Sequence, residues 1–317
     1  MSHQALKINF FLPLFLIGLS FLFLPGNSYY ETLALVPRPP QTVALKFDPP
    51  PLPSLPQARF DLPLDLNTGA ALLLDFNSGM ILYAKNSKRE LPPASLTKIM
   101  TAVIVLENFS NDDLVIISKV EDYGQVIGLV EGEQITVKNL LYGLLVHSGN
   151  DAAYALADFY PGGRDSFVAA MNEKAKSLGM ENTFFANPNG QYDPNHHSTA
   201  EDLARLTMYA WRQGEFQEVV GRKEKIICDV SGQICHSLVS TNELLEIFPG
   251  ALGVKTGWIE ESEGCFVGFF DENDGQRLLS VVLGSQDRFQ DTQKLVGWGL
   301  VNFSYCPLIQ AESTAGK

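Results

Sequence analysis

The chain has 317 residues, of which 45% are apolar and 19% are charged, which is long enough for one large globular domain or two ordinary ones. This composition excludes a wholly disordered protein. The formal net charge is −13, from 36 acidic and 23 basic residues, which argues against sequence-independent binding to nucleic acid phosphates.

The first 25 residues are expected to form a membrane-targeting segment. Residues 8–30 carry no charge and are mostly apolar, a window long enough to cross a bilayer. Two interpretations stay open: a cleaved secretory signal in which Lys7 is the short basic n-region, or a retained membrane anchor. Retention is favoured because Gly26 and Ser28 only approximate a small-residue cleavage pattern. A buried core helix fits this terminal position less well.

Residues 26–65 are expected to form a proline-rich linker. Ten of the 18 prolines of the chain lie between Pro25 and Pro63. Proline lacks a backbone N–H and favours extended polyproline II geometry, so the segment predicts a semi-rigid spacer. A ligand for a proline-binding module is the alternative, and the sequence supplies no context for it. The folded domain is expected over residues 66–310, followed by a short tail, 311–317.

The folded part begins with a predicted β-hairpin and a core helix. Residues 70–76 and 80–85 are predicted to form two strands, joined by a turn at residues 77–79. An almost wholly apolar run follows at 94–107, which favours a helix through the middle of a core. Its residues 103–105 would also suit a strand.

The middle of the chain predicts amphipathic helices and the last third predicts strands. The third and fourth helices are expected to end at Gly179 and Gly214, and Ser198 with Glu201 is expected to form a capping box at the start of the fourth. Strands at both ends with helices between them predict one α+β domain. The expected helices cover 137–146, a segment from 151, 165–178, a segment from 198 and 292–301, and the expected strands cover 225–230, 233–239, 252–258, 264–270 and 277–285.

Three short motifs occur in order along this domain. They are Ser95-Leu-Thr-Lys98, Ser148-Gly-Asn150 and Lys255-Thr-Gly257. Each motif alone is a weak signal, and a competing S-x-N match lies at 240–242. Whether the three motifs belong to one active site must therefore be judged from their order and from the residues around them.

The first motif has a clear chemical rationale. Three positions apart on a helix, Ser95 and Lys98 share one face, so the amine can take the hydroxyl proton. The first turn of a helix also offers a free backbone N–H and the positive end of the dipole to a developing oxyanion. The alternative is an N-cap serine and a solvated lysine, but a helix that is apolar on nearly all sides offers Lys98 no solvent-exposed face.

With its flanking sequences, the chain resembles the serine D-alanyl-D-alanine carboxypeptidases, low-molecular-weight penicillin-binding proteins that share three motifs with the serine β-lactamases. The resemblance covers about residues 66–305 and implies an antiparallel sheet flanked by helices, with a helical subdomain. The stretches that carry it are NSGMILYAKNSKRELPPASLTKIMTA, LLVHSGNDAAYALA, FVAAMNEKAKSLGMENTFFANPNG, HSTAEDLARL and GVKTGW.

The resemblance assigns catalytic roles to four residues. It implies that Ser95 is the acylated nucleophile and Lys98 its general base. Ser148 would pass a proton to the leaving amine, and Asn150 would position Lys98 and the substrate amide. The oxyanion would be bound by the backbone N–H groups of Ser95 and Trp258.

It also assigns five residues to substrate binding: Lys255, Thr256, Gly257, Trp258 and Arg288. Lys255 and Thr256 would bind the terminal carboxylate of the substrate, with Arg288 as a second cationic contact or, alternatively, an ordinary surface arginine. Trp258 stands where many family members carry histidine or tyrosine. Two lysines in one cleft would disfavour each other's charge, which would help to keep Lys98 neutral.

The implied activity is removal of the terminal D-alanine from peptidoglycan stem peptides, outside the cytoplasmic membrane, with β-lactams as inhibitors. A DD-endopeptidase with the same residues is the nearest alternative. A class A β-lactamase is disfavoured because no glutamate between Asn150 and Lys255 has an asparagine four residues later. A catalytically silent wall-binding module is disfavoured because every motif residue is intact.

No metal or other cofactor is expected. The chain lacks an H-E-x-x-H motif, and His196 and His197 lie in a polar loop, where an exposed or structural role is favoured over metal binding.

The four cysteines divide into two kinds. Cys228 and Cys235 flank a predicted hairpin turn, which favours a cross-strand disulfide in an exported protein. Cys265 and Cys306 are expected as buried apolar residues. A zinc site built on Cys228, Cys235 and His236 is the disfavoured alternative.

Overall fold

The computed structural model describes residues 55–60, 62–272 and 276–305. The chain divides into two units, Met1–Pro51 and Leu52–Lys317, and every described residue belongs to the second unit. The expected membrane segment at 1–25, most of the expected linker and the tail at 311–317 lie outside the described residues. Within the described ranges, no helix has the length and apolarity needed to cross a bilayer.

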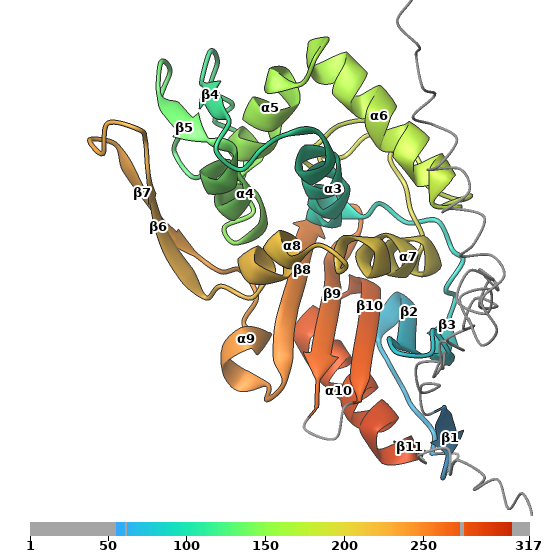
Figure 1. Cartoon of the computed structure of the whole chain (residues 1–317). Coiled ribbons are helices and arrows are strands. Elements are labelled where there is room, and N and C mark those ends of the chain that lie inside the picture. Colours follow the sequence, from blue (N-terminus) through green and yellow to red (C-terminus); the bar gives the residue numbers. More distant parts are fainter. Residues whose placement is uncertain (1–54, 61, 273–275, 306–317) are drawn as a thin grey trace, which may run out of the picture. The chain divides into compact units, whose positions relative to one another are not determined.

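A five-stranded antiparallel sheet forms the centre of the second unit (Figure 1). The strands lie in the order β3-β2-β10-β9-β8, so the N-terminal hairpin pairs with strands from the far end of the chain. This arrangement confirms the α+β prediction. The strands are β2 (Thr68–Asp75), β3 (Ile81–Lys85), β8 (Ala251–Ile259), β9 (Glu263–Asp271) and β10 (Arg277–Ser285).

Both faces of the sheet are covered by helices, which explains why its strands are continuous apolar runs. Along β2, Ala70, Leu72 and Leu74 belong to one apolar core, and Ala71 and Leu73 to the other. The first core is formed between the sheet and the helices of the middle of the chain. The second lies under the C-terminal helix α10 (Arg288–Asn302).

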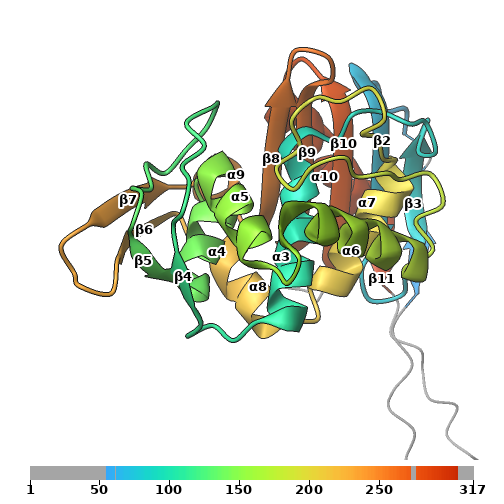
Figure 2. The ribbon, with the colours of Figure 1, turned by 90° about the horizontal axis from the view of Figure 1, so that it is seen from above.

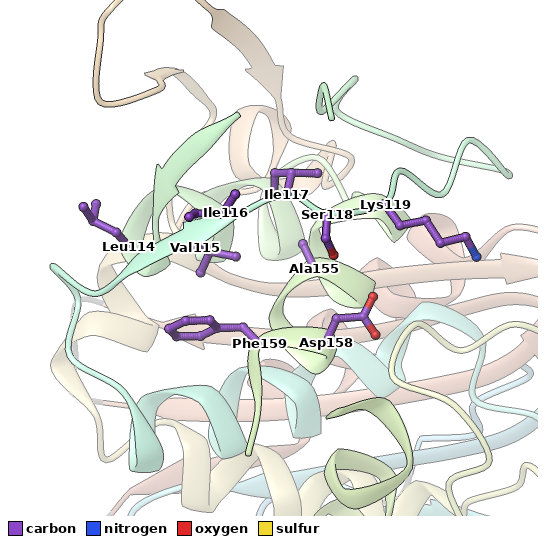
Figure 3. Close-up of a pocket in the computed structure, with 9 residues that line it drawn as sticks. All are labelled: Leu114, Val115, Ile116, Ile117, Ser118, Lys119, Ala155, Asp158 and Phe159. Carbon is purple, nitrogen blue, oxygen red and sulfur yellow. The ribbon is translucent and has the colours of Figure 1, made fainter. Parts of the chain in front are cut away.

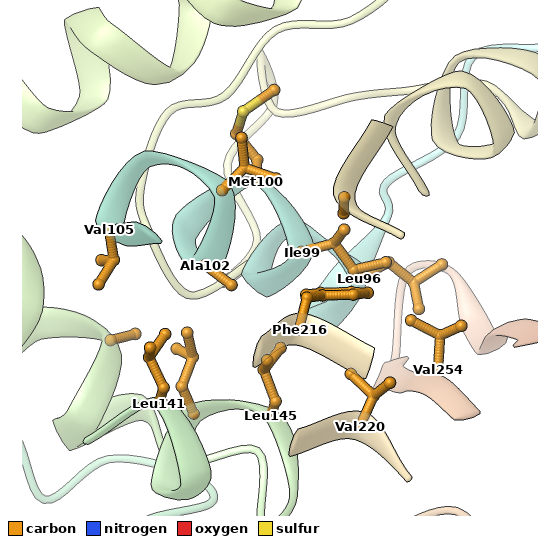
Figure 4. Packing of buried hydrophobic residues seen from close by; sticks show 14 of the residues in the cluster. Leu96, Ile99, Met100, Ala102, Val105, Leu141, Leu145, Phe216, Val220 and Val254 are labelled. Atoms are coloured by element: carbon orange, nitrogen blue, oxygen red, sulfur yellow. The ribbon is translucent and has the colours of Figure 1, made fainter. Parts of the chain in front are cut away.

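Helix α3 (Lys98–Asn108) runs through the centre of the larger core (Figure 4). Every residue from Lys98 to Val105 is buried, so packing on all sides overrides the strand preference of residues 103–105. A short 3₁₀ turn, η2 (Ala94–Thr97), precedes it. The surrounding helices are α4 (Val137–Leu145), α5 (Asn150–Phe159), α6 (Gly163–Ser177), α7 (Ala200–Ala210) and α8 (Gly214–Val220).

The start of α7 differs from the predicted capping box. Thr199 caps this helix, because its hydroxyl accepts the backbone N–H of Asp202 at 3.1 Å. The Ser198 hydroxyl instead pairs with that of Thr183, and the Glu201 carboxylate accepts from the Ser87 hydroxyl. The capping-box prediction was therefore wrong by one residue at the N-cap.

The predicted end of α7 was also wrong. The helix ends at Ala210, and Gly214 begins α8, a helix that the sequence did not predict. Trp211 follows the last helical residue and stacks on Phe269 of β9 at a centroid separation of 3.8 Å. This tertiary contact ends the helix where no local stop signal occurs.

Two small two-stranded sheets lie outside the central sheet: β4 (Leu114–Ile116) with β5 (Gln134–Thr136), and β6 (Glu224–Cys228) with β7 (Cys235–Val239). The β6–β7 hairpin projects away from the central sheet in both views (Figures 1 and 2). The predicted Cys228–Cys235 disulfide is confirmed, at directly opposed positions of the hairpin. The pair β4–β5 and the short helix α9 (Leu244–Ile247) were not predicted.

A further strand lies within the segment that was expected as linker. Strand β1 (Pro56–Ala58) pairs antiparallel with β11 (Phe303–Tyr305), and the Arg59 backbone N–H donates to the Asn302 carbonyl. The ordered chain therefore includes residues before position 66. A proline is tolerated here because this strand has only one neighbour.

Candidate active site

The three sequence motifs converge at one place, between the sheet and the helices. Ser95 lies in η2, Lys98 begins α3, Asn150 begins α5, and the Lys255-Thr-Gly motif lies in β8. The Lys98 Nζ lies 2.8 Å from both Ser95 Oγ and Asn150 Oδ1. The fold thus joins motifs that are more than 150 residues apart in the sequence.

Lys98 is fully buried and makes three hydrogen bonds. Its third partner is the backbone carbonyl of Asn189, at 3.0 Å. Burial holds the pKa of Lys98 well below its usual value, and the nearby charge of Lys255 lowers this pKa further, while Asp151 raises it. A neutral amine has two N–H groups for Asn150 and Asn189 and one lone pair for the Ser95 hydroxyl proton. The environment therefore suits Lys98 as a base.

Ser95 is half-buried among fully buried neighbours, and its side chain reaches a cavity. The prediction of a helical first turn is confirmed, with the difference that the turn is 3₁₀. Ala94 immediately before it has a φ of +50°, an uncommon conformation for a residue with a side chain. Such conformations concentrate at functional sites.

Gly257 and Gly190 allow two backbone segments to approach this turn closely. A Cβ atom at Gly257 would lie 3.1 Å from the Ser95 backbone nitrogen, and one at Gly190 would lie 1.9 Å from the Ala94 carbonyl oxygen. Strand β8 therefore lies directly against the turn that carries Ser95. This places the backbone of Trp258, the next residue, near the same turn.

Ser148 occupies the turn between α4 and α5. It is buried, with a left-handed φ of +64°. Across the described part of the chain, its hydroxyl has no hydrogen-bond partner, which leaves that group free for a substrate.

Asn150 and Asp151 fasten a neighbouring loop to the site. The Asn150 Nδ2 donates to the Tyr123 carbonyl at 2.8 Å, and its backbone N–H donates to the Gln125 carbonyl. The Asp151 carboxylate accepts backbone N–H groups of residues 127–129. These hydrogen bonds attach the loop to the start of α5. Residues 123–125 of the loop line one side of the cavity beside Ser95.

Two basic side chains, Lys255 and Arg288, lie on the sheet side of the site, although neither is among the residues that line the cavity beside Ser95. Lys255 in β8 is 1% exposed, and its Nζ donates to the Thr256 carbonyl at 3.0 Å. Burial lowers its pKa to about 7, helped by the charge of Arg288. Burial also lowers the pKa of Arg288, whose buried Nε has no partner in the described structure. Arg288 is therefore partly buried, with an N–H group that has no partner among the described residues.

A cavity of about 610 Å³ opens beside Ser95. Asn150, Gly190 and Trp258 line it together with residues of two loops. Trp258 is 63% exposed, so its side chain forms part of the rim. The remaining lining residues are Tyr123, Gly124, Gln125, Asn189, Gln191, Tyr192, Ile259, Glu260 and Glu261.

Another cavity, of about 300 Å³, lies between β4 and α5 (Figure 3). Its acidic residue, Asp158, is already paired with Arg164 at 2.8 Å. Leu114, Ile116 and Phe159 provide much of the lining. This cavity lacks the arrangement of nucleophile and base found at Ser95.

The sequence did not identify Asn189, Gly190 or Thr241 as site residues. Asn189 acts through its backbone carbonyl, which no side-chain motif can reveal. Thr241 pairs with the Thr256 hydroxyl at 2.5 Å, and its only signal was the S-x-N match at 240–242.

The histidines and cysteines have structural roles. His196 is buried, its Nε2 lies 2.9 Å from the Thr97 hydroxyl, and burial lowers its pKa to about 4. Cys265 is buried, as expected, whereas Cys306 lies outside the described residues. The disulfide removes both thiols of the alternative zinc site, and His236 pairs instead with Glu133. Over the described ranges, no cluster of His, Cys, Asp and Glu could hold a metal ion.

Fold and site together define a class of protein in which a serine hydroxyl lies 2.8 Å from a fully buried lysine amine, beside a strand that carries a second buried lysine. Comparison with known proteins identifies the family within this class. The profile of the D-alanyl-D-alanine carboxypeptidase family, Peptidase S11, matches residues 57–287. The chain belongs to this family.

Individual relatives agree with this assignment. D-alanyl-D-alanine carboxypeptidase DacF of Bacillus subtilis is 33% identical over 258 residues, which cover 78% of this chain and 66% of that protein. A D-alanyl-D-alanine endopeptidase of Pseudomonas aeruginosa is 32% identical over 262 residues, covering 80% and 83%. The chain thus spans slightly less than two thirds of the length of DacF.

Solved structures support the fold. The crystal structure of the Streptomyces K15 DD-transpeptidase matches with a TM-score of 0.72 and 33% sequence identity. The match covers 76% of this chain and 100% of that chain. The penicillin-binding fold is therefore established for the second unit.

Proposed function

We propose that the protein is a serine D-alanyl-D-alanine carboxypeptidase that removes the terminal D-alanine from peptidoglycan stem peptides. One observation carries the proposal: the fully buried Lys98 amine lies 2.8 Å from the Ser95 hydroxyl. Family membership and the relatives named as carboxypeptidases support the choice of substrate.

In the proposed acylation step, Ser95 Oγ forms a bond to the carbonyl carbon of the penultimate D-alanine. The hydroxyl proton passes to Lys98 Nζ, whose lowered pKa keeps the amine able to accept it. The carbonyl oxygen becomes an oxyanion beside the backbone N–H groups of Ser95 and Trp258. Close packing of Gly257 against the Ser95 backbone supports this placement.

The peptide C–N bond then breaks. A proton held by Lys98 reaches the departing amine through the Ser148 hydroxyl, so D-alanine leaves with an intact amino group. Asn150 keeps Lys98 in place through its Oδ1. A water molecule hydrolyses the remaining Ser95 ester and restores the hydroxyl.

The sheet wall is proposed to hold the terminal carboxylate of the substrate. Lys255 and Arg288 supply positive charge, and among the described residues neither has a carboxylate partner within hydrogen-bonding distance; Thr256 supplies a hydroxyl. A cationic pocket for a chain end favours removal of a terminal residue over cleavage within a chain. Trp258, at the rim, would limit the space around the leaving residue.

The enzyme is proposed to work outside the cytoplasmic membrane, where peptidoglycan lies. The Cys228–Cys235 disulfide supports an oxidising compartment. Residues 1–25 would attach the catalytic domain to the membrane or direct its export, and residues 26–65 would include the spacer.

The second candidate is a DD-endopeptidase, favoured by the P. aeruginosa relative with that name. Incubation of the purified protein with monomeric pentapeptides and with cross-linked dimers separates the two activities. The proposal predicts free D-alanine from the monomer as the faster reaction. Faster release of monomers from dimers would establish the endopeptidase instead, and no product from either substrate would contradict both.

A further inference from the structure

A third chain segment, which follows β7, reaches the proposed carboxylate site. The Thr241 backbone N–H donates to the Val146 carbonyl at 3.2 Å, two residues before Ser148. Its hydroxyl oxygen lies 2.5 Å from that of Thr256 in β8. Thr241 therefore bridges the turn that carries Ser148 and the strand that carries Lys255.

We infer that Thr241 is a positioning residue for recognition of the substrate carboxylate: its hydroxyl donates to Thr256 Oγ1 and thereby directs the Thr256 proton toward the substrate. The inference deepens the proposed function and rests on it. It assigns a role to the S-x-N match at 240–242 that the catalytic motifs leave unused.

The argument depends on the direction of one proton. A carboxylate only accepts hydrogen bonds, whereas each threonine hydroxyl has one proton and two lone pairs. If Thr256 donated to Thr241, a lone pair of Thr256 would face the carboxylate. If Thr241 donates, the Thr256 proton is free for the substrate, and the two bonds polarise each other.

Geometry restricts the alternatives for this pair. Among the described residues, Thr256 is the only hydrogen-bond partner of the Thr241 hydroxyl. Thr256 is 5% exposed and lies on a paired strand opposite Phe266, so its side chain has a defined position. Each hydroxyl thus has the other as its protein partner.

The charges around the pair fit an anionic ligand. Lys255 donates to the Thr256 carbonyl, which brings its ammonium group beside the same residue. Glu243, two residues after Thr241, lies close enough to Arg288 to influence its charge, although the two form no ion pair within 4.0 Å in the described structure. The segment 241–243 therefore contacts Thr256 through its first residue and lies near Arg288 through its last.

The test compares acylation by benzylpenicillin with acylation by its methyl ester, which lacks the carboxylate charge. Second-order rates are measured by intact-protein mass spectrometry for wild type, Thr241→Val and Thr241→Ser. Thr241→Val should slow acylation by benzylpenicillin about fivefold to tenfold and leave the slower reaction of the ester almost unchanged. Thr241→Ser, which keeps the donor, should retain the wild-type preference.

A matched control is Ser237→Ala, which removes an exposed hydroxyl from β7, a strand that belongs to a different sheet from the strand of Thr256. Equal slowing of both reagents by Thr241→Val would reveal a merely structural role and overturn the inference, as would no slowing of either. The proposed function fails separately, if wild type is acylated by neither reagent.

Discussion

The helical wall and the sheet wall of the site each contain a buried lysine, but the groups around the two amines differ. On the helical wall, the Lys98 amine lies beside the Asn150 and Asn189 carbonyl oxygens and the Ser95 hydroxyl, so a neutral amine can donate to the two carbonyls and accept the hydroxyl proton. On the sheet wall, Lys255 has one backbone acceptor and lies near Arg288. The comparison teaches that a neighbouring hydroxyl distinguishes the two lysines: Lys98 lies beside a proton that it can accept, whereas the one hydrogen-bond partner of Lys255 in the described structure is a carbonyl, which has no proton to give.

The largest expected effect comes from removing the base on the helical wall. Lys98→Met should lower the rate of acylation by benzylpenicillin by about 10³-fold, because Ser95 loses its proton acceptor. Mass spectrometry of the Ser95 adduct over time measures this rate. Lys88→Met, at a side chain 78% exposed, is the matched control and should act like wild type. A residual rate within tenfold of wild type would show that another group is the base.

The sheet wall should respond differently to loss of its lysine. Lys255→Met should lower kcat/KM for a carboxylate-terminated peptide about 10-fold to 100-fold, because a charged contact to the substrate is lost.

The pH profile of this variant tests the coupling between the walls. The Lys255 ammonium lowers the pKa of Lys98, so its removal should raise that pKa. The rising limb of the acylation rate should therefore move to higher pH in Lys255→Met. Identical limbs in both proteins would contradict the coupling and leave burial as the cause of the lowered pKa.

The close approach of the two walls depends on Gly257. Gly257→Ala adds a Cβ atom 3.1 Å from the Ser95 backbone nitrogen, tighter than most real contacts, so the strand and the turn must separate slightly. Acylation should slow about tenfold, because positioning errors well below 1 Å already affect a reacting site. Gly297→Ala, where no atom lies within 4 Å of the added Cβ, should leave the rate unchanged. Equal rates in all three proteins would show that the contact is not required.

The smallest effect on activity is expected from the β6–β7 hairpin. Replacing Cys228 and Cys235 together by serine opens a loop of sequence separation 7 and should lower the free energy of unfolding by about 2 kcal/mol. Acylation should stay within about twofold of wild type, because the hairpin turn lies away from the cleft. Chemical denaturation and the adduct rate measure the two quantities. A large loss of activity without a loss of stability would tie the hairpin to the reaction.

The sequence predicted those parts of the site that consist of side chains in short motifs. The spacing of Ser95 and Lys98 predicted their contact, and the family resemblance pointed to Asn150 and Lys255, which the fold brings to the same place. The Asn189 carbonyl could not be found in this way, because every residue has such a group and only the fold directs it.

The fold was predictable where the pattern was strong and local. The strands of the central sheet follow apolar runs buried on both faces, and α3 follows a run that packs on all sides. The misplaced cap and the misplaced end of α7 coincide with contacts between residues distant in the sequence: the Ser198 hydroxyl pairs with that of Thr183, and Trp211 stacks on Phe269. Strand β1 was hidden in a proline-rich segment, since its partner β11 comes from the other end of the chain.

The central claim is that Ser95 is the nucleophile of an acyl-enzyme formed with help from Lys98. The most direct measurement is intact-protein and peptide mass spectrometry after incubation with benzylpenicillin, for wild type and for Ser95→Ala. We expect one covalent adduct on the peptide that contains Ser95 in wild type and none in the variant. An unmodified, folded wild-type protein, or an adduct that persists in Ser95→Ala, would contradict the account.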